Sequence, residues 1–116
     1  MIRKILTTYA TLMEEYLSRF HSQPEGLATV GQIGNSMEEK PNKIVVCLLN
    51  VEMETTGGIA APMQRTEEGY ARMQPPLLLN LSVMLAAVFD ERQYAESLSL
   101  LTDTLRFIQS VPKFEV

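Results

Sequence analysis

The sequence predicts an α+β domain in which a small mixed or antiparallel β-sheet packs against two amphipathic helices. One segment near each end of the chain places apolar residues at helical spacings of three and four. The segments between them include two that are rich in apolar and β-branched residues, which is typical of strands. The chain has 116 residues, enough for one hydrophobic core, so we expect a single domain over residues 1–116.

The first predicted helix opens the chain. Apolar residues recur at helical spacings, and they are Ile2, Ile5, Leu6, Tyr9, Leu12, Met13, Tyr16, Leu17 and Phe20. Polar residues fill the opposite face. The helix is expected to end near His21, because Pro24 disfavours helical geometry at the residue before it. A short, glycine-interrupted edge strand over residues 28–33 and a polar loop over residues 35–42 should follow.

Residues 44–54 form the next predicted strand. The segment is apolar through Leu49 and then alternates, with Asn50, Glu52 and Glu54 sharing one face. We therefore expect a strand that starts buried and ends half exposed.

Residues 55–74 form a long connection that contains Gly57, Gly58, Pro62 and Gly69. Connections of this length in compact domains are uncommon and are usually functional or mobile. The segment is thus a candidate contact loop.

Residues 77–89 follow a Pro-Pro pair and are almost continuously apolar. The prolines and the β-branched Val83 and Val88 favour a long buried strand, with a helix as the alternative. The segment is well short of the roughly 20 residues that span a bilayer, so we expect no membrane span.

A second helix is predicted after residue 90. Asp90 offers a side-chain cap, and Gln93 stands at the reciprocal position of a capping box. Apolar residues then follow at alternating spacings of four and three, which gives the stripe Tyr94, Leu98, Leu101, Leu105 and Ile108. Pro112 should end this helix, and residues 113–116 resemble the start of another strand.

Composition excludes several classes of function. The net charge is −4 and the basic residues are scattered, so nucleic acid is not an expected partner. The single cysteine, Cys47, cannot form an internal disulfide, and one histidine cannot complete a Cys/His metal set. No export signal is visible at the N-terminus. We expect synthesis in a reducing, cytoplasmic compartment.

Few residues could carry out catalysis. His21 could act as a general base, but a helix-end histidine beside the last carbonyls is the favoured interpretation. Cys47 lies in an apolar run, where a thiol behaves as a small hydrophobe. Glu52 and Glu54 could bind a cation or act as acid and base, yet no third ligand accompanies them. Gly57-Gly58 lacks the spacing of a phosphate loop. We expect no enzyme activity, cofactor or metal.

Two amides lie inside the apolar strands. Asn50 and Asn80 must find hydrogen-bond partners, since an unpaired buried amide costs about 1–3 kcal/mol. We expect them to bond to each other or to the backbone, and subunit contact is the alternative.

A set of motifs resembles a known family. Residues 75–87 read PPLLLNLSVMLAA, and residues 94–98 and 107–109 read YAESL and FIQ. In this combination the chain resembles the cap, or tail-terminator, proteins of phage-tail-like contractile injection systems. Members are similar to this chain in opening with a helix and in carrying a strand like residues 48–54, LLNVEME. Their Pro-Pro-x-x-x-Asn-Leu strand is followed by a helix and a Phe-containing strand, for which this chain has Phe114.

The resemblance implies a tail-terminator-like fold and a non-enzymatic role. It implies a subunit of a hexameric ring that closes the distal end of the inner tube and engages the last sheath layer. The partners would be further copies of the chain and the tube and sheath proteins, with no membrane insertion. Assembly would be cytoplasmic, as part of a particle that can be released extracellularly. Family members continue past this point with further strands.

The contact residues follow from the long connection and from the polar strand face. We hypothesise that this set forms subunit or tube contacts: Asn50, Glu52, Glu54, Gly57, Gly58, Arg65, Glu67, Glu68 and Phe114. Two other functions stay open, a small adaptor that binds one protein and a small hydrolase that uses His21.

Overall fold

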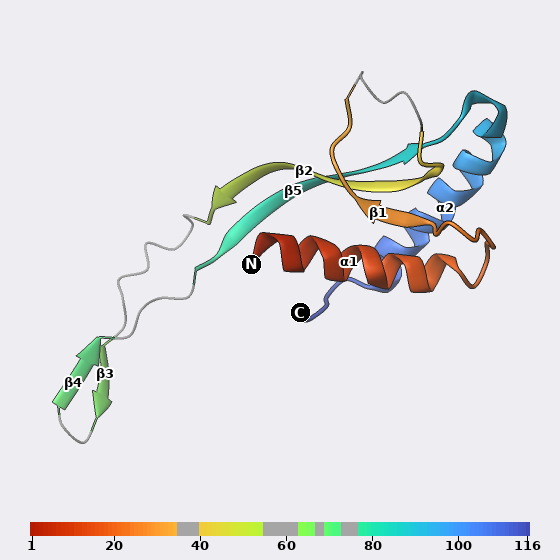
Figure 1. The fold of residues 1–116 in the computed structure, drawn as a ribbon. Helices are drawn as coiled ribbons and strands as arrows, with labels where there is room; N and C mark the ends of the chain where they lie inside the picture. The colour runs from red at the N-terminus through yellow and green to blue at the C-terminus, as the bar shows by residue number, and fades with distance from the viewer. Residues whose placement is uncertain (35–39, 55–62, 67–68, 73–76) are drawn as a thin grey trace. The chain divides into compact units, whose positions relative to one another are not determined.

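The computed structural model describes residues 1–34, 40–54, 63–66, 69–72 and 77–116 (Figure 1). The elements in chain order are α1 (Ile2–Leu17), β1 (Ala28–Val30), β2 (Lys43–Met53), β3 (Met63–Thr66), β4 (Gly69–Arg72), β5 (Leu79–Val88), the 3-10 helix η1 (Glu91–Gln93) and α2 (Tyr94–Ser110). The chain divides into two compact units, residues 1–48 with 83–116 and residues 49–82. The predicted α+β class is confirmed.

The main sheet has the strand order β1-β2-β5. β1 runs parallel to β2, with Ala28 opposite Ile44 and Val30 opposite Val46. β2 and β5 point in opposite directions in Figure 1, so the sheet is mixed. β1 lies at one edge, which confirms the edge strand predicted near residue 28, although the strand ends at Val30.

The first unit has one core between the sheet and the helices. Figure 1 shows α1 and α2 on the same side of the sheet. The buried apolar side chains are Leu6, Ala10, Met13 and Leu17 of α1, Leu27 after it, Ile44 and Val46 of β2, and Leu100 and Phe107 of α2. The ring of Phe107 is fully buried, with its centroid 5.2 Å from that of Tyr9 and 5.6 Å from that of Tyr16. The apolar face predicted for the first helix is therefore the core face.

The apolar stripe predicted on the second helix is not its core face. Most of the stripe is exposed, namely Tyr94 at 66%, Leu98 at 46%, Leu105 at 58% and Ile108 at 41%. The buried residues of α2 are instead Ser97, Leu100, Asp103, Thr104 and Phe107. Burial of the polar residues is tolerated because the hydroxyls bond within the helix, where Thr104 Oγ1 donates to the Leu100 carbonyl at 2.8 Å. The spacing showed an apolar stripe but not which neighbour covers it.

The predicted cap is confirmed in one half. Asp90 Oδ1 accepts a hydrogen bond from the Arg92 backbone N–H at 3.0 Å, and this bond holds the pKa of Asp90 below its usual value. The prediction that the Gln93 side chain accepts the Asp90 backbone N–H is wrong, because this N–H donates to Asn42 Oδ1 at 2.9 Å. Asn42 has a positive φ of 56°, a conformation that asparagine tolerates better than most residues. Asp90 is thus the N-cap of η1 and is held by Asn42 of the predicted loop, whereas α2 begins at Tyr94 with Gln93 as its N-cap and no side-chain cap bond.

The strand predicted over residues 77–89 is confirmed as β5, and the helix alternative is wrong. The prediction that this strand is buried is also wrong, since its positions alternate between half-buried and exposed as far as Met84 and are half-buried from Leu85 to Val88. Val83, Leu85 and Ala87 pack against the core, whereas Met84 is exposed. β5 stands at the end of the strand order, and both helices lie on one side of the sheet. Val45 of β2, between the core residues Ile44 and Val46, is also buried, at 1% exposure.

The second unit contains the outer part of β2 and two short strands. The predicted grading from buried to exposed is present, but the expected half-exposed end is wrong, because residues 49–53 are all exposed. β3 and β4 pair antiparallel, with Met63 opposite Arg72 and Thr66 opposite Gly69. The segment predicted as a connection thus holds a strand pair. Each strand has only four residues, which is too few for the sequence pattern to reveal it. The rest of residues 55–74 lies outside the described residues.

The C-terminal segment does not have the predicted structure. Residues 113–116 do not form a strand, and the ring of Phe114 packs beside Tyr9 with centroids 5.3 Å apart. Within the described part of the chain, no helix has the length and apolarity that crossing a membrane requires.

Candidate functional site

A polar cluster lies on the outer parts of β2 and β5, and we call it the strand-end cluster (Asn50, Glu52, Glu54 and Asn80). Asn50 Nδ2 donates to Glu52 Oε1 at 3.0 Å, and Asn80 Nδ2 donates to Glu54 Oε2 at 3.0 Å. The Glu54 N–H donates to the Leu78 carbonyl at 2.9 Å. Side-chain bonds within and between the strands thus orient both carboxylates.

The residues of the strand-end cluster differ in exposure. Asn50, Glu52 and Asn80 are exposed and Glu54 is half-buried. The amides therefore find internal partners, as expected, but each bonds to a glutamate, and the prediction that they bond to each other is wrong. The cluster presents anionic hydrogen-bond acceptors that could bind backbone N–H groups or basic side chains of another protein.

The other candidate residues lie in different parts of the chain. Arg65 lies in β3 opposite Tyr70. Gly57, Gly58, Glu67 and Glu68 lie outside the described residues. Phe114 belongs to the first unit and is half-buried against Tyr9. The structure thus brings together Asn50, Glu52 and Glu54, and it adds Asn80, whose strand position the sequence had already singled out.

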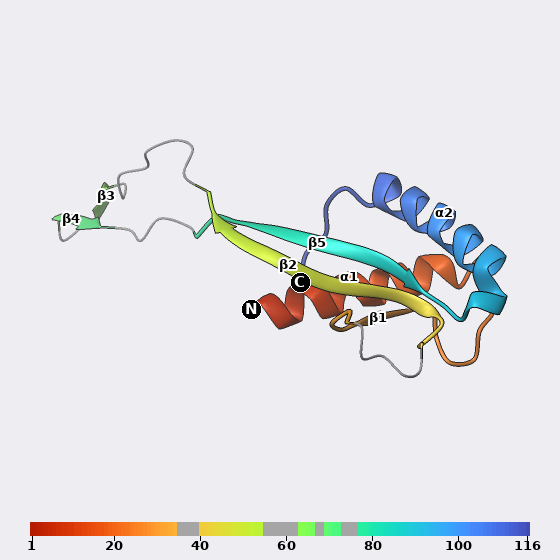
Figure 2. The same ribbon diagram turned by 90° about the horizontal axis from the view of Figure 1, so that it is seen from above.

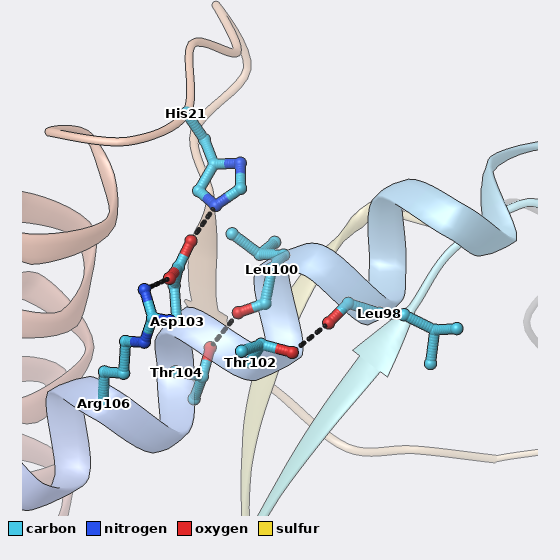
Figure 3. Close-up of polar contacts among 7 residues, drawn as sticks. All are labelled: His21, Leu98, Leu100, Thr102, Asp103, Thr104 and Arg106. Atoms are coloured by element: carbon cyan, nitrogen blue, oxygen red, sulfur yellow. Dashed lines mark hydrogen bonds and ion pairs between the residues drawn. The ribbon is translucent and has the colours of Figure 1, made fainter.

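His21 has a partner that the sequence did not indicate. Its Nε2 lies 2.6 Å from Asp103 Oδ2, and Arg106 Nη1 donates to Asp103 Oδ1 at 3.3 Å (Figure 3). His21 lies just after α1, as the favoured interpretation expected, with its backbone N–H donating to the Leu17 carbonyl at 3.0 Å, but its imidazole bonds to Asp103. The available signal was an acidic residue three positions after Leu100 and four before Phe107, on the face that the core covers.

His21 borders a cavity of about 320 Å³. Its polar lining includes Ser22, Gln23 and Arg92. A carboxylate that orients an imidazole is one part of a nucleophilic triad. Asp103 is the one side chain bonded to His21 among the described residues, so the pair primarily ties the end of α1 to α2.

Cys47 and the acidic residues show no further chemistry in the described part of the chain. Cys47 is half-buried, with Sγ 3.8 Å from the Leu48 carbonyl oxygen. No group of three or more His, Cys, Asp or Glu residues in the described ranges is arranged to hold a metal ion.

Comparison with protein-family models gives the Pvc16 N-terminal domain over residues 4–116. The chain belongs to the Pvc16 N-terminal domain family. This family is associated with phage-tail-like contractile injection systems, which confirms the family that the sequence motifs resemble. Comparison with curated proteins gave no match. The matched region of this Pvc16 N-terminal domain includes both the strand-end cluster and the His21–Asp103 pair, and the family identifies the chain as a protein of a phage-tail-like particle.

Proposed function

We propose that this Pvc16 N-terminal domain is a structural cap, or terminator, subunit of a contractile injection system. In this role it closes the distal end of the inner tube and contacts the terminal sheath layer. The observation that carries the proposal is the family match over residues 4–116. The subunits would form a hexameric ring, because a closed ring is an ordinary way for head-to-tail contacts to end.

The strand-end cluster supports a contact role for the second unit. Glu52 and Glu54 are held by amide donors and reach solvent. Charged acceptors fixed in this way lose little side-chain entropy when a donor from the tube, the sheath or a neighbouring subunit binds. The connection around β3 and β4 would add to the same contacts.

In the proposed role the chain catalyses no reaction and needs no cofactor or metal. Packing and hydrogen bonding suffice for a cap, and the His21–Asp103 pair then serves the fold alone. Loss of a measured turnover in a correctly folded His21→Ala variant would contradict this part. The acidic net charge of −4 also favours protein partners over nucleic acid.

Particle assembly tests the role directly. Particles assembled with a Glu52→Ala/Glu54→Ala double variant should show open tube ends and a broad length distribution by electron microscopy. Glu115→Ala is the matched control, because Glu115 is also exposed but lies in the first unit. Normal particles from the double variant would remove the cluster from the proposal. Normal capped particles made without this chain would contradict the cap itself.

The connection and the ring need separate experiments. Deleting residues 58–68 should disturb capping in the same way, and unchanged particles would remove the connection as a contact. Native mass spectrometry of assembled caps should show six times 13.1 kDa, about 79 kDa. An assembly of another order would contradict the hexamer.

A further inference from the structure

The stripe on α2 is an apolar surface that the first unit leaves uncovered. We call it the α2 stripe (Tyr94, Leu98, Leu101, Leu105 and Ile108). Figure 3 shows Leu98 pointing to the opposite side of the helix from Asp103, which faces His21. The alternating spacing of four and three residues is the pattern by which one helix packs along another. The stripe is therefore built for a helix, and the described part of the first unit supplies none.

The neighbouring edge of the sheet is also unguarded. Residues 83–88 of β5 read VMLAAV, without a proline or a charged residue. β5 ends the strand order, and no described strand pairs with its outer side. Natural edge strands are usually blunted by lysine, proline or a bulge, because a free edge is a template for another strand. This edge has the composition of a strand that accepts a partner.

Helix α2, which carries the stripe, and the free edge of β5 lie on the same side of the first unit. Figure 2 shows α2 alongside β5, on the side of β5 away from β2. A second sheet that continued from β5 would bring its own flanking helix next to α2. One partner can thus cover both surfaces at once.

We propose that two copies of the free chain pair through this face, β5 against β5 in antiparallel orientation and α2 stripe against α2 stripe. Like must meet like in such a two-fold contact, so charges beside the stripe would repel. The positions that flank it on the exposed side are neutral: Ala95, Thr102 and Gln109. The edge residues 83–88 are neutral as well. Self-pairing therefore brings no like charges together at these flanking and edge positions.

The area of the face shows why both elements are needed. The exposed parts of the stripe side chains amount to roughly 400 Å² per copy, or roughly 800 Å² for two. Stable interfaces begin near 1,200 Å², so the helices alone fall short and the paired strands must supply the remainder. A contact of this size is modest in affinity, and a single charge in either element should dissociate it.

This pair is independent of the proposed cap. A closed ring joins two different faces of each subunit, whereas the pair joins one face to itself. Failure of either proposal can therefore be told from failure of the other.

Light scattering and sedimentation of the purified chain over a wide concentration range test the pair. The chain should reach twice 13.1 kDa, about 26 kDa. Leu105→Glu and Met84→Lys should each raise the dissociation constant at least about tenfold. Ser99→Glu places the same negative charge as Leu105→Glu on another exposed face of α2, and it should leave the dissociation constant unchanged. Circular dichroism verifies that each variant is folded.

A charge-pairing rescue makes the geometry specific. Antiparallel pairing centred between Leu101 and Thr102 sets Leu98 of one copy beside Leu105 of the other. Leu98→Lys and Leu105→Glu should each be monomeric alone and should form a mixed dimer when combined. A wild-type chain that is monomeric at every concentration, a dimer that Leu105→Glu leaves intact, or a mixture that stays monomeric would overturn the pair. A hexamer that resists these substitutions would also overturn it, while leaving the ring standing.

Discussion

Glu14 offers a sharp test of how α1 is joined to the sheet. Its Oε2 accepts hydrogen bonds from the backbone N–H of Leu27 at 2.6 Å and of Ala28 at 3.0 Å. Leu27 is buried, so a donor left without an acceptor there cannot turn freely to water. The sequence alone placed this carboxylate on the polar face of an amphipathic helix.

The expected cost of removing the carboxylate follows from these two bonds. A hydrogen bond to a charged group contributes about 1.5–3 kcal/mol. Allowing for partial access of water to Ala28, Glu14→Ala should lower the free energy of unfolding by about 3 kcal/mol. Domains are stable by only about 5–15 kcal/mol, so this is a large fraction. Glu14→Gln keeps one neutral acceptor and should cost about half as much.

Urea unfolding followed by circular dichroism measures this effect. With a slope near 1.5 kcal/mol per molar, Glu14→Ala should move the midpoint down by about 2 M. Glu15→Ala is the control, because Glu15 is exposed on the same helix and should change stability by less than about 0.5 kcal/mol. Equal effects of the two substitutions, or no effect of Glu14→Ala, would refute the reasoning.

Three further outcomes are expected. Phe107→Ala should cost about 3–5 kcal/mol in urea unfolding because the ring is fully buried, whereas Ile108→Ala should cost less than about 1 kcal/mol; the reverse order would mean that the stripe is the core face. Asp103→Ala should lower the free energy of unfolding by about 1–3 kcal/mol, because it removes the hydrogen-bond partner of the part-buried His21 imidazole. Asp103→Asn should lose less, and equal losses for the two variants would contradict this role of the pair. The Arg92 backbone N–H lowers the pKa of folded Asp90 below 3.8, so its stabilisation is present above 3.8 and is lost as the pH falls through the folded value. Asp90→Asn should therefore lose less stability over that acidic range, and an unchanged pH profile would count against the cap.

Local patterns predicted the elements well. α1 follows from the apolar spacing of its residues, and Asp90 is an N-cap as its position predicted, although the helix that it caps is the 3-10 helix η1 directly before α2. β2 changes from buried to exposed where apolar residues give way to alternation. These features depend on residues within a few positions of one another, which is the range over which hydrophobic periodicity and capping act. The family motifs were likewise readable from the sequence.

The cluster of candidate residues was predicted in part. The polar positions Asn50, Glu52 and Glu54 followed from strand alternation, but the bond from Asn80 to Glu54 joins residues 26 positions apart. No local pattern specifies which residues of two strands lie opposite each other. The pairing of β3 with β4 was missed for the same reason.

The sequence by itself determined the two long helices and the three strands of the main sheet, the apolar stripe of each helix and the family. The tertiary structure alone decided which stripe becomes core, and it turned α2 so that Phe107 is buried and Leu105 is exposed. It also decided the partners of His21 and Asp103, which are 82 positions apart. The physical reason is that periodicity records where apolar side chains gather, whereas burial depends on which distant surface arrives to cover them.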